Sequence, residues 1–162
     1  MFRVLATFGG MECNTIFPGI VSDFYKKSEI TATDISKKAL LVAKRNAKKY
    51  NLENKIKFIN YNWISTNEKF DLVISNPPYL SFGQYDNCEI NVKKFEPKIA
   101  LVGGYDGLES YRQISRIANS ILNNNSLLFI EIGRSQAADI KKIFRNHNIN
   151  LIKIIKDYRE MD

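Results

Sequence analysis

The sequence has few of the residues that build metal centres, disulfide frameworks or membrane spans. Its 162 residues include two cysteines, Cys13 and Cys88, and one histidine, His147. The cysteines match no metal-binding or redox spacing, and one histidine cannot form a multi-histidine metal site. No run of about 18 apolar residues is present, and the N-terminus lacks the layout of a signal peptide. We therefore expect a soluble, cytoplasmic protein without a metal or a membrane partner.

Composition indicates one globular domain with an excess of positive charge. Lys and Arg number 24 against 17 Asp and Glu, the net charge is +7, and 44% of residues are hydrophobic. Basicity favours contact with the ribosome or a nucleic acid only weakly, because lysine is abundant along the whole chain and a solvated helix face is the favoured explanation. The densest basic run comprises Lys37, Lys38, Lys44, Arg45, Lys48, Lys49, Lys55 and Lys57.

From Glu29 onward, strand-like runs alternate with helical patterns, which is typical of βαβ units around a mostly parallel sheet. Strands are expected at residues 29–33, 57–61, 70–75, 127–132 and 149–155, with a turn at residues 123–125. Helices are expected from Ser36, which is a suitable cap, and at about residues 106–122 and 135–145. The buried face of the first helix is expected to carry Ala39, Leu40, Ala43, Ala47 and Tyr50. Residues 80–105 lack clear periodicity and predict a long functional loop.

The first 28 residues do not follow this pattern. Val4 and Leu5 are compatible with the end of a first strand and Gly9-Gly10 with a turn, but Pro18-Gly19 interrupts the helix that a βαβ unit needs next. We expect residues 1–28 to form a degenerate strand and turn region, followed by a catalytic core at residues 29–162 within one domain.

The residues most informative about chemistry are Asn76, Pro77, Pro78 and Tyr79, directly after the expected strand at residues 70–75. Ligands of open α/β sheets bind outside the carboxyl ends of strands. The Asn76 side-chain carbonyl and the Pro77 backbone carbonyl are two acceptors that can hold both hydrogens of an NH2 group. Such a grip aims a weakly nucleophilic amide nitrogen at an electrophile, and Tyr79 adds a flat face for stacking. The alternative is that two prolines merely end a strand.

This four-residue string, with its strand in front, resembles the Asn-Pro-Pro-Tyr class of S-adenosylmethionine-dependent N-methyltransferases. Within that class the sequence resembles the peptide chain release factor glutamine methyltransferases, the HemK/PrmC family. The resemblance covers roughly residues 30–158 and implies a Rossmann-like class I methyltransferase core with a mostly parallel sheet, incomplete at the termini. Further matching residues are Phe95-Glu96-Pro97, Ala100-Leu101, Gly104, Asp106-Gly107-Leu108, Tyr111, Glu131-Ile132-Gly133 and Asp157-Tyr158.

The resemblance implies S-adenosyl-L-methionine as cofactor and a release factor as protein substrate. Asp34 matches the acidic position that accepts hydrogen bonds from the ribose hydroxyls, although capping of the following helix is an equally good role for it. Trp63 matches the position beside the adenine, and an ordinary buried aromatic is its alternative. Asn76 is expected to touch both the cofactor and the substrate amide, and residues 76–79 together are the expected catalytic and substrate-binding residues.

The sequence departs from the family at the glycine-rich turn Asp-x-Gly-x-Gly-x-Gly, which normally follows the first strand. Residues 4–10 resemble an eroded form of it, with Ala6 at the acidic position and Phe8 at a glycine position. Two alternatives to release factor methylation therefore stay open. One is an N-methyltransferase for amino groups of nucleic acids, and the other is a non-catalytic fragment of the glutamine methyltransferase.

Overall fold

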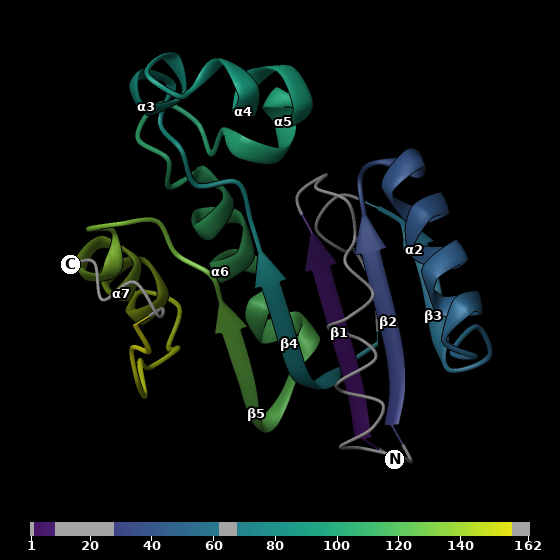
Figure 1. The fold of residues 1–162 in the computed structure, drawn as a ribbon. Coiled ribbons are helices and arrows are strands. Elements are labelled where there is room, and N and C mark those ends of the chain that lie inside the picture. Colours follow the sequence, from purple (N-terminus) through teal and green to yellow (C-terminus); the bar gives the residue numbers. More distant parts are fainter. Residues whose placement is uncertain (1, 9–27, 62–67, 157–162) are drawn as a thin grey trace.

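The computed structural model describes residues 2–8, 28–61 and 68–156. Their strands form a five-stranded sheet in the order β3-β2-β1-β4-β5, in which every neighbouring pair is parallel (Figure 1). The predicted α/β class with a parallel sheet is therefore confirmed. The strands are β1 (Phe2–Phe8), β2 (Ser28–Asp34), β3 (Ile56–Asn60), β4 (Phe70–Asn76) and β5 (Leu122–Ile130).

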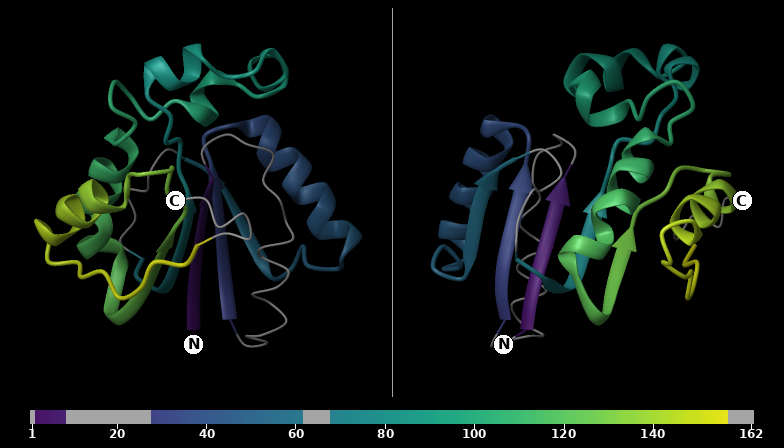
Figure 2. Two further views of the ribbon diagram at one scale, coloured as in Figure 1. Left: turned by 60° about the vertical axis from the view of Figure 1, so that its left-hand side comes forward. Right: turned by 180° about the vertical axis from the view of Figure 1, so that it is seen from behind.

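Helices flank both faces of the sheet and also extend beyond its upper edge. Three short helices lie past the carboxyl ends of the strands and form a cap there (Figures 1 and 2). None of the described helices is long and apolar enough to cross a membrane. The helices are α2 (Lys37–Lys49), α6 (Glu109–Ile121) and α7 (Ala137–Arg145), and the cap helices are α3 (Phe82–Asp86), α4 (Ile90–Phe95) and α5 (Lys98–Leu101).

Alternating residues of the central strands supply the core on both faces of the sheet. Val4 of β1 packs in one cluster with Ala47 of α2, whereas its neighbour Leu5 packs in a second cluster with Ile121 of α6. Successive side chains of a strand point to opposite faces, so one strand anchors two helical layers. A third cluster joins α6 and α7 through residues that include Tyr111 and Phe144. β4 contributes to the core on both faces of the sheet, which explains why apolar residues predominate in the strand predicted at residues 70–75.

The first predicted helix is confirmed in its start and in most of its buried face. The Ser36 side chain accepts a hydrogen bond from the Ala39 amide at 3.2 Å, as expected for the N-terminal cap. The lysines and arginine of α2 are exposed, as predicted. The prediction that Tyr50 belongs to the buried face is wrong, because Tyr50 follows the last helical turn and is 57% exposed.

Residues 80–105 do not form the long loop that the sequence predicts, because they contain α3, α4 and α5. The helices are four to six residues long, too short to show a helical period in the sequence. Two local hydrogen bonds start α3: the Ser81 side chain accepts from the Gln84 amide, and the Gln84 side chain accepts from the Ser81 amide. This capping box is the signal in the sequence that could have located α3.

The last two predicted strands need correction. The three asparagines that predict a turn before β5 lie within it, where the register with β4 shifts and Asn125 has a φ of 60°. The strand predicted at residues 149–155 is wrong, because residues 151–156 have no regular secondary structure and are exposed. An apolar run becomes a strand only when a neighbouring edge supplies hydrogen bonds, and β5 pairs only with β4 among the described residues.

Asp71 links three strands at the amino-terminal edge of the sheet. Its carboxylate accepts hydrogen bonds of 2.8 Å from the Arg3 amide of β1 and 2.8 Å from the Asn123 side chain of β5. These two hydrogen bonds lower the pKa of Asp71 below its usual value. The same carboxylate therefore holds β1 and β5 against β4.

We expect Asp71→Ala to lower the free energy of unfolding by about 1 kcal/mol at neutral pH, because two hydrogen bonds to a partly solvated carboxylate are lost. The folded-state pKa of Asp71 lies below its unfolded value, so this contribution is complete above the unfolded pKa and disappears as pH falls through the folded pKa. Urea unfolding at neutral pH and at about pH 2 measures the difference. Asp86→Ala in exposed α3 is the control. If Asp71→Ala lowered the free energy of unfolding equally at both pH values, the ionised carboxylate of Asp71 would not be the stabilising group.

Candidate active site

Three adjacent strands end at the same level on one edge of the sheet. Phe8, the last residue of β1, is the register partner of both Asp34 at the end of β2 and Asn76 at the end of β4. Neighbouring strands lie about 4.8 Å apart, so the backbones of Asp34 and Asn76 are roughly 10 Å apart across the sheet. β2 pairs with one side of β1 and β4 with the other side, so the direction in which successive strands are added reverses at β1. Ligands of open α/β sheets bind at such a point.

Asp34 is held at the start of the turn between β2 and α2. It is 1% exposed, and its carboxylate accepts a hydrogen bond of 2.6 Å from the Ser36 amide. The Asn60 side chain donates to the Asp34 carbonyl at 2.9 Å and thereby ties the end of β3 to the same turn. The helix cap is Ser36 and not Asp34, so the capping role that the sequence allows for Asp34 is wrong.

Residues 76–79 leave β4 and pass beneath the cap. Asn76 is the last residue of the strand, and Pro77 is fully buried. Leu80, directly after this segment, is bridged to Val102: its amide donates to the Leu101 carbonyl and its carbonyl accepts from the Gly103 amide, both at 2.9 Å. We call residues 76–79 the 76–79 loop. The sheet fixes this loop at Asn76, and the bridge at Leu80 fixes the chain directly after Tyr79.

Three glycines pack directly against the 76–79 loop. A Cβ on Gly103 would lie 2.5 Å from the Pro78 carbonyl oxygen, and a Cβ on Gly107 would overlap the Tyr79 carbonyl oxygen. A Cβ on Gly133 would lie 3.0 Å from the Tyr79 ring. Gly107 also has a φ of 77°, a conformation that favours glycine. The absence of these side chains lets neighbouring segments enclose the loop closely.

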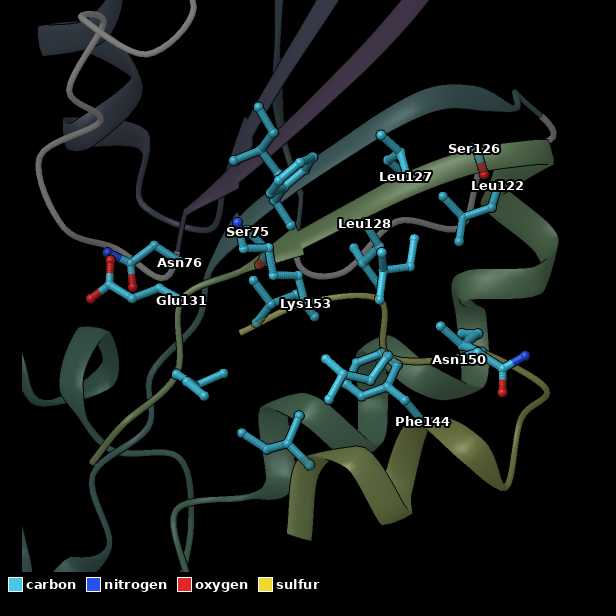
Figure 3. Close-up of a pocket in the computed structure, with 18 of the residues that line it drawn as sticks. Ser75, Asn76, Leu122, Ser126, Leu127, Leu128, Glu131, Phe144, Asn150 and Lys153 are labelled. Carbon is cyan, nitrogen blue, oxygen red and sulfur yellow. The ribbon is translucent and has the colours of Figure 1, made fainter. Parts of the chain in front are cut away.

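The ring and hydroxyl of Tyr79 face the end of β5. The Glu131 carboxylate is hydrogen-bonded to the Tyr79 hydroxyl, and Figure 3 shows the Glu131 side chain beside Asn76. Burial, followed by the charge and hydrogen bond of Glu131, raises the pKa of Tyr79. Burial also raises the pKa of Glu131, while the hydrogen bond from Tyr79 opposes that rise. Asn76, Tyr79 and Glu131 therefore form one cluster at the ends of β4 and β5.

A cavity of about 1450 Å³ opens beside this cluster and runs along β5 (Figure 3). Its lining includes Asn76 and Glu131 at one end and apolar side chains such as Leu127, Phe144 and Ile152 farther along. Asp34 does not line it. The cavity therefore adjoins the 76–79 loop from the β5 side, opposite the β1 and β2 strand ends.

Several predicted site residues lie outside the described part of the chain. These are Trp63, the Gly9-Gly10 turn and Asp157-Tyr158. Of the described candidates, the structure brings Asn76, the two prolines and Tyr79 into one loop and places Asp34 two strands away at the same level. Sequence analysis missed Gly103 and Gln136. The Gln136 side chain donates to the Tyr79 carbonyl across 57 residues of sequence, so no local pattern could have revealed it.

Comparison with known proteins identifies the fold. Residues 18–94 match the family model described as "Methyltransferase small domain". A methyltransferase from Pyrococcus furiosus has a similar solved structure, with a TM-score of 0.62 and 18% identity over 88% of this chain and 62% of that chain. The chain therefore has the Rossmann-like fold of the class I S-adenosylmethionine-dependent methyltransferases.

Curated relatives are more specific. The bifunctional methyltransferase of Rickettsia prowazekii (strain Madrid E) is 42% identical over 132 residues, which are 80% of this chain and 26% of that protein. The release factor glutamine methyltransferase of Clostridium acetobutylicum is 37% identical over 146 residues, which are 88% of this chain and 51% of that protein. The chain is thus a homologue of the release factor glutamine methyltransferases, and the resemblance in its sequence is confirmed. It spans about half of one relative's length and about a quarter of the other's.

We expect Gly107→Ala to lower the free energy of unfolding by about 2–4 kcal/mol, because the new methyl group meets a carbonyl oxygen and the residue keeps a positive φ. Gly83→Ala in α3 is the matched control, since a Cβ there would have no atom within 4 Å. That control is expected to stabilise the chain by about 0.5–1 kcal/mol. Chemical denaturation of both variants measures these values, and similar values for the two would show that the close approach at Gly107 is not rigid.

We also expect Glu131→Gln to lower the pKa of Tyr79 toward, but not to, its usual value. The substitution removes the negative charge beside the hydroxyl and leaves the burial of the ring, which is the larger cause of the raised pKa. NMR titration of ¹³C-labelled tyrosine, with the Tyr79 signal assigned by Tyr79→Phe, measures the change. Glu29→Gln, an exposed carboxylate on β2, serves as the control. A Tyr79 pKa that is the same in wild type and Glu131→Gln would remove Glu131 from the cluster.

Proposed function

We propose that the chain carries the catalytic core of a methyltransferase that modifies the side-chain amide nitrogen of a glutamine in a peptide chain release factor. The observation that carries the proposal is the 76–79 loop, placed at the reversal of strand order and enclosed by three glycines. Homology to proteins named release factor glutamine methyltransferase supports the substrate. We infer that the enzyme acts in the cytoplasm, where translation ends.

The described residues suit S-adenosyl-L-methionine as the methyl donor. Hydrogen-bond acceptors are found at the ends of β2 and β4, about 10 Å apart and on the same level, which suits an elongated ligand lying across β1. Asp34 is the residue that would accept hydrogen bonds from ribose hydroxyls, and Asn76 would meet the methionine part. The bound cofactor supplies an electrophilic methyl group on a sulfonium sulfur.

The 76–79 loop prepares the amide nitrogen for attack. The Asn76 side-chain oxygen and the Pro77 carbonyl oxygen each accept one N–H of the substrate amide, and the Tyr79 ring stacks on the amide plane. Both acceptors interact more strongly as positive charge develops on the nitrogen, so they stabilise the transition state more than the ground state. Held in this way, the amide nitrogen would be aimed at the methyl group that the bound cofactor supplies. After methylation, one proton would leave the nitrogen for water, which restores a neutral N-methyl amide.

The direct test is transfer of a labelled methyl group from S-adenosylmethionine to purified release factor, followed by location of the methyl group by mass spectrometry. Methylation of a glutamine side chain is the expected outcome. Methylation of nucleic acid in its place would favour an enzyme for amino groups of bases. A folded chain that does not bind S-adenosylmethionine would favour the non-catalytic fragment.

We expect Asn76→Ala and Asp34→Asn to separate substrate activation from cofactor binding. Asn76→Ala removes one of the two acceptors of the grip and is expected to reduce kcat by at least about 100-fold with cofactor affinity largely retained. Asp34→Asn keeps an acceptor for the Ser36 amide but is expected to weaken cofactor binding by about 10-fold or more. Calorimetry and single-turnover methylation measure the two effects. Unchanged turnover in Asn76→Ala would overturn the mechanism.

A further inference from the structure

Gln136 occupies a buried position behind the 76–79 loop. It is the residue immediately before α7 and is 9% exposed. The preceding residue, Ser135, has a φ of 64°, which turns the chain between β5 and α7. The resulting turn presents the Gln136 side chain to the 76–79 loop and not to solvent.

Both the nitrogen and the oxygen of the Gln136 carboxamide form hydrogen bonds. Its nitrogen donates to the Tyr79 carbonyl at 2.9 Å and to the Gly107 carbonyl at 3.4 Å. Its oxygen accepts from the Gly133 amide at 3.0 Å and from the Tyr111 hydroxyl at 3.4 Å. A primary amide has two donor hydrogens and an acceptor oxygen with two lone pairs. Both donor hydrogens and one acceptor lone pair have partners of their own. The single Tyr111 hydrogen is shared with the Glu131 carbonyl, which lies closer at 3.1 Å. These bonds fix the side chain in one orientation.

The composition of the 76–79 loop explains why such an external donor is needed. Pro77 and Pro78 have no N–H, so they cannot hold the loop by donating backbone hydrogen bonds. Only Asn76 and Tyr79 keep a backbone N–H in this segment, and a carbonyl of the loop is held by a donor from another element. β4 fixes Asn76 at one end of the loop, and the Gln136 nitrogen binds the carbonyl of Tyr79 at the other end.

We propose that Gln136 is a positioning residue for methyl transfer, because its carboxamide nitrogen holds the Tyr79 carbonyl and so sets where the substrate-binding acceptors of the 76–79 loop lie. This proposal rests on the proposed function of the loop. Gln136 touches neither substrate nor cofactor. It acts through Tyr79, whose displacement moves the stacking ring and tilts the Pro77 carbonyl away from the substrate amide.

The experiment compares Gln136→Met with the wild-type chain. Methionine has nearly the same length and fills the same space, but it has no N–H to donate. We expect kcat for methylation of release factor to fall by about 10–100-fold, because a displacement of about 1 Å in a positioning group has effects of that size. Cofactor affinity and KM for release factor are expected to change less than about threefold, because the remaining binding contacts are kept.

Two control variants separate positioning from stability. Ile143→Ala weakens the packing of α7 on α6 without touching a hydrogen bond of Gln136 or the lining of the cavity, and is expected to lower Tm while kcat stays within about twofold. Gln113→Ala removes a glutamine whose side chain donates to Glu109 on the same helix, and it is expected to leave kcat unchanged. A loss of kcat in Ile143→Ala equal to that in Gln136→Met would show that Gln136 acts only by docking α7, which would overturn the proposal.

A crystal structure of Gln136→Met keeps the proposal testable if wild-type protein methylates no release factor. In that case the proposed function fails by itself, and the position of the Tyr79 carbonyl decides the role of Gln136. A displacement of about 1 Å or more relative to wild type supports the positioning role. An unmoved 76–79 loop, or full activity of Gln136→Met, overturns it.

Discussion

The parallel pairing of β1 with β2 on one side and β4 on the other is the constraint on which the site depends. Its register brings Phe8 level with Asp34 and Asn76, so three strands end together. Parallel strands must be joined by crossovers, which place helices on both faces and leave the carboxyl edge open for a ligand. Residues at that edge become neighbours in space although Asp34 and Asn76 are 42 positions apart in the sequence.

The second constraint is close packing around the 76–79 loop. Its two prolines have no backbone N–H, so the shape of the loop is set by glycines at close range and by a donor from another element. These contacts hold the loop in one shape. This rigidity matches the requirement of the proposed reaction, in which two acceptors must already point at the amide nitrogen before charge develops.

Sequence analysis predicted most of the sheet because the signals of these strands and helices are local. Alternating core positions, the Ser36 cap and the run before Asn76 each reflect residues within a few positions of one another. Two failures have different physical causes. The apolar run at residues 149–155 has strand composition but no paired edge, and such an edge would come from a segment distant in the sequence. The cap helices are too short to show a helical period.

The sequence by itself determined the fold class, the 76–79 loop at the end of a buried strand, and the family that these residues resemble, because each depends on a short string with its flanking strand. Only the tertiary structure decided that Gly103, Gly107 and Gly133 enclose the loop and that Gln136 holds the Tyr79 carbonyl. It also decided that Glu131 lies beside Asn76 (Figure 3). These contacts join β4, β5, α7 and the segment after the cap, and only the packing of the folded chain brings them within hydrogen-bonding distance.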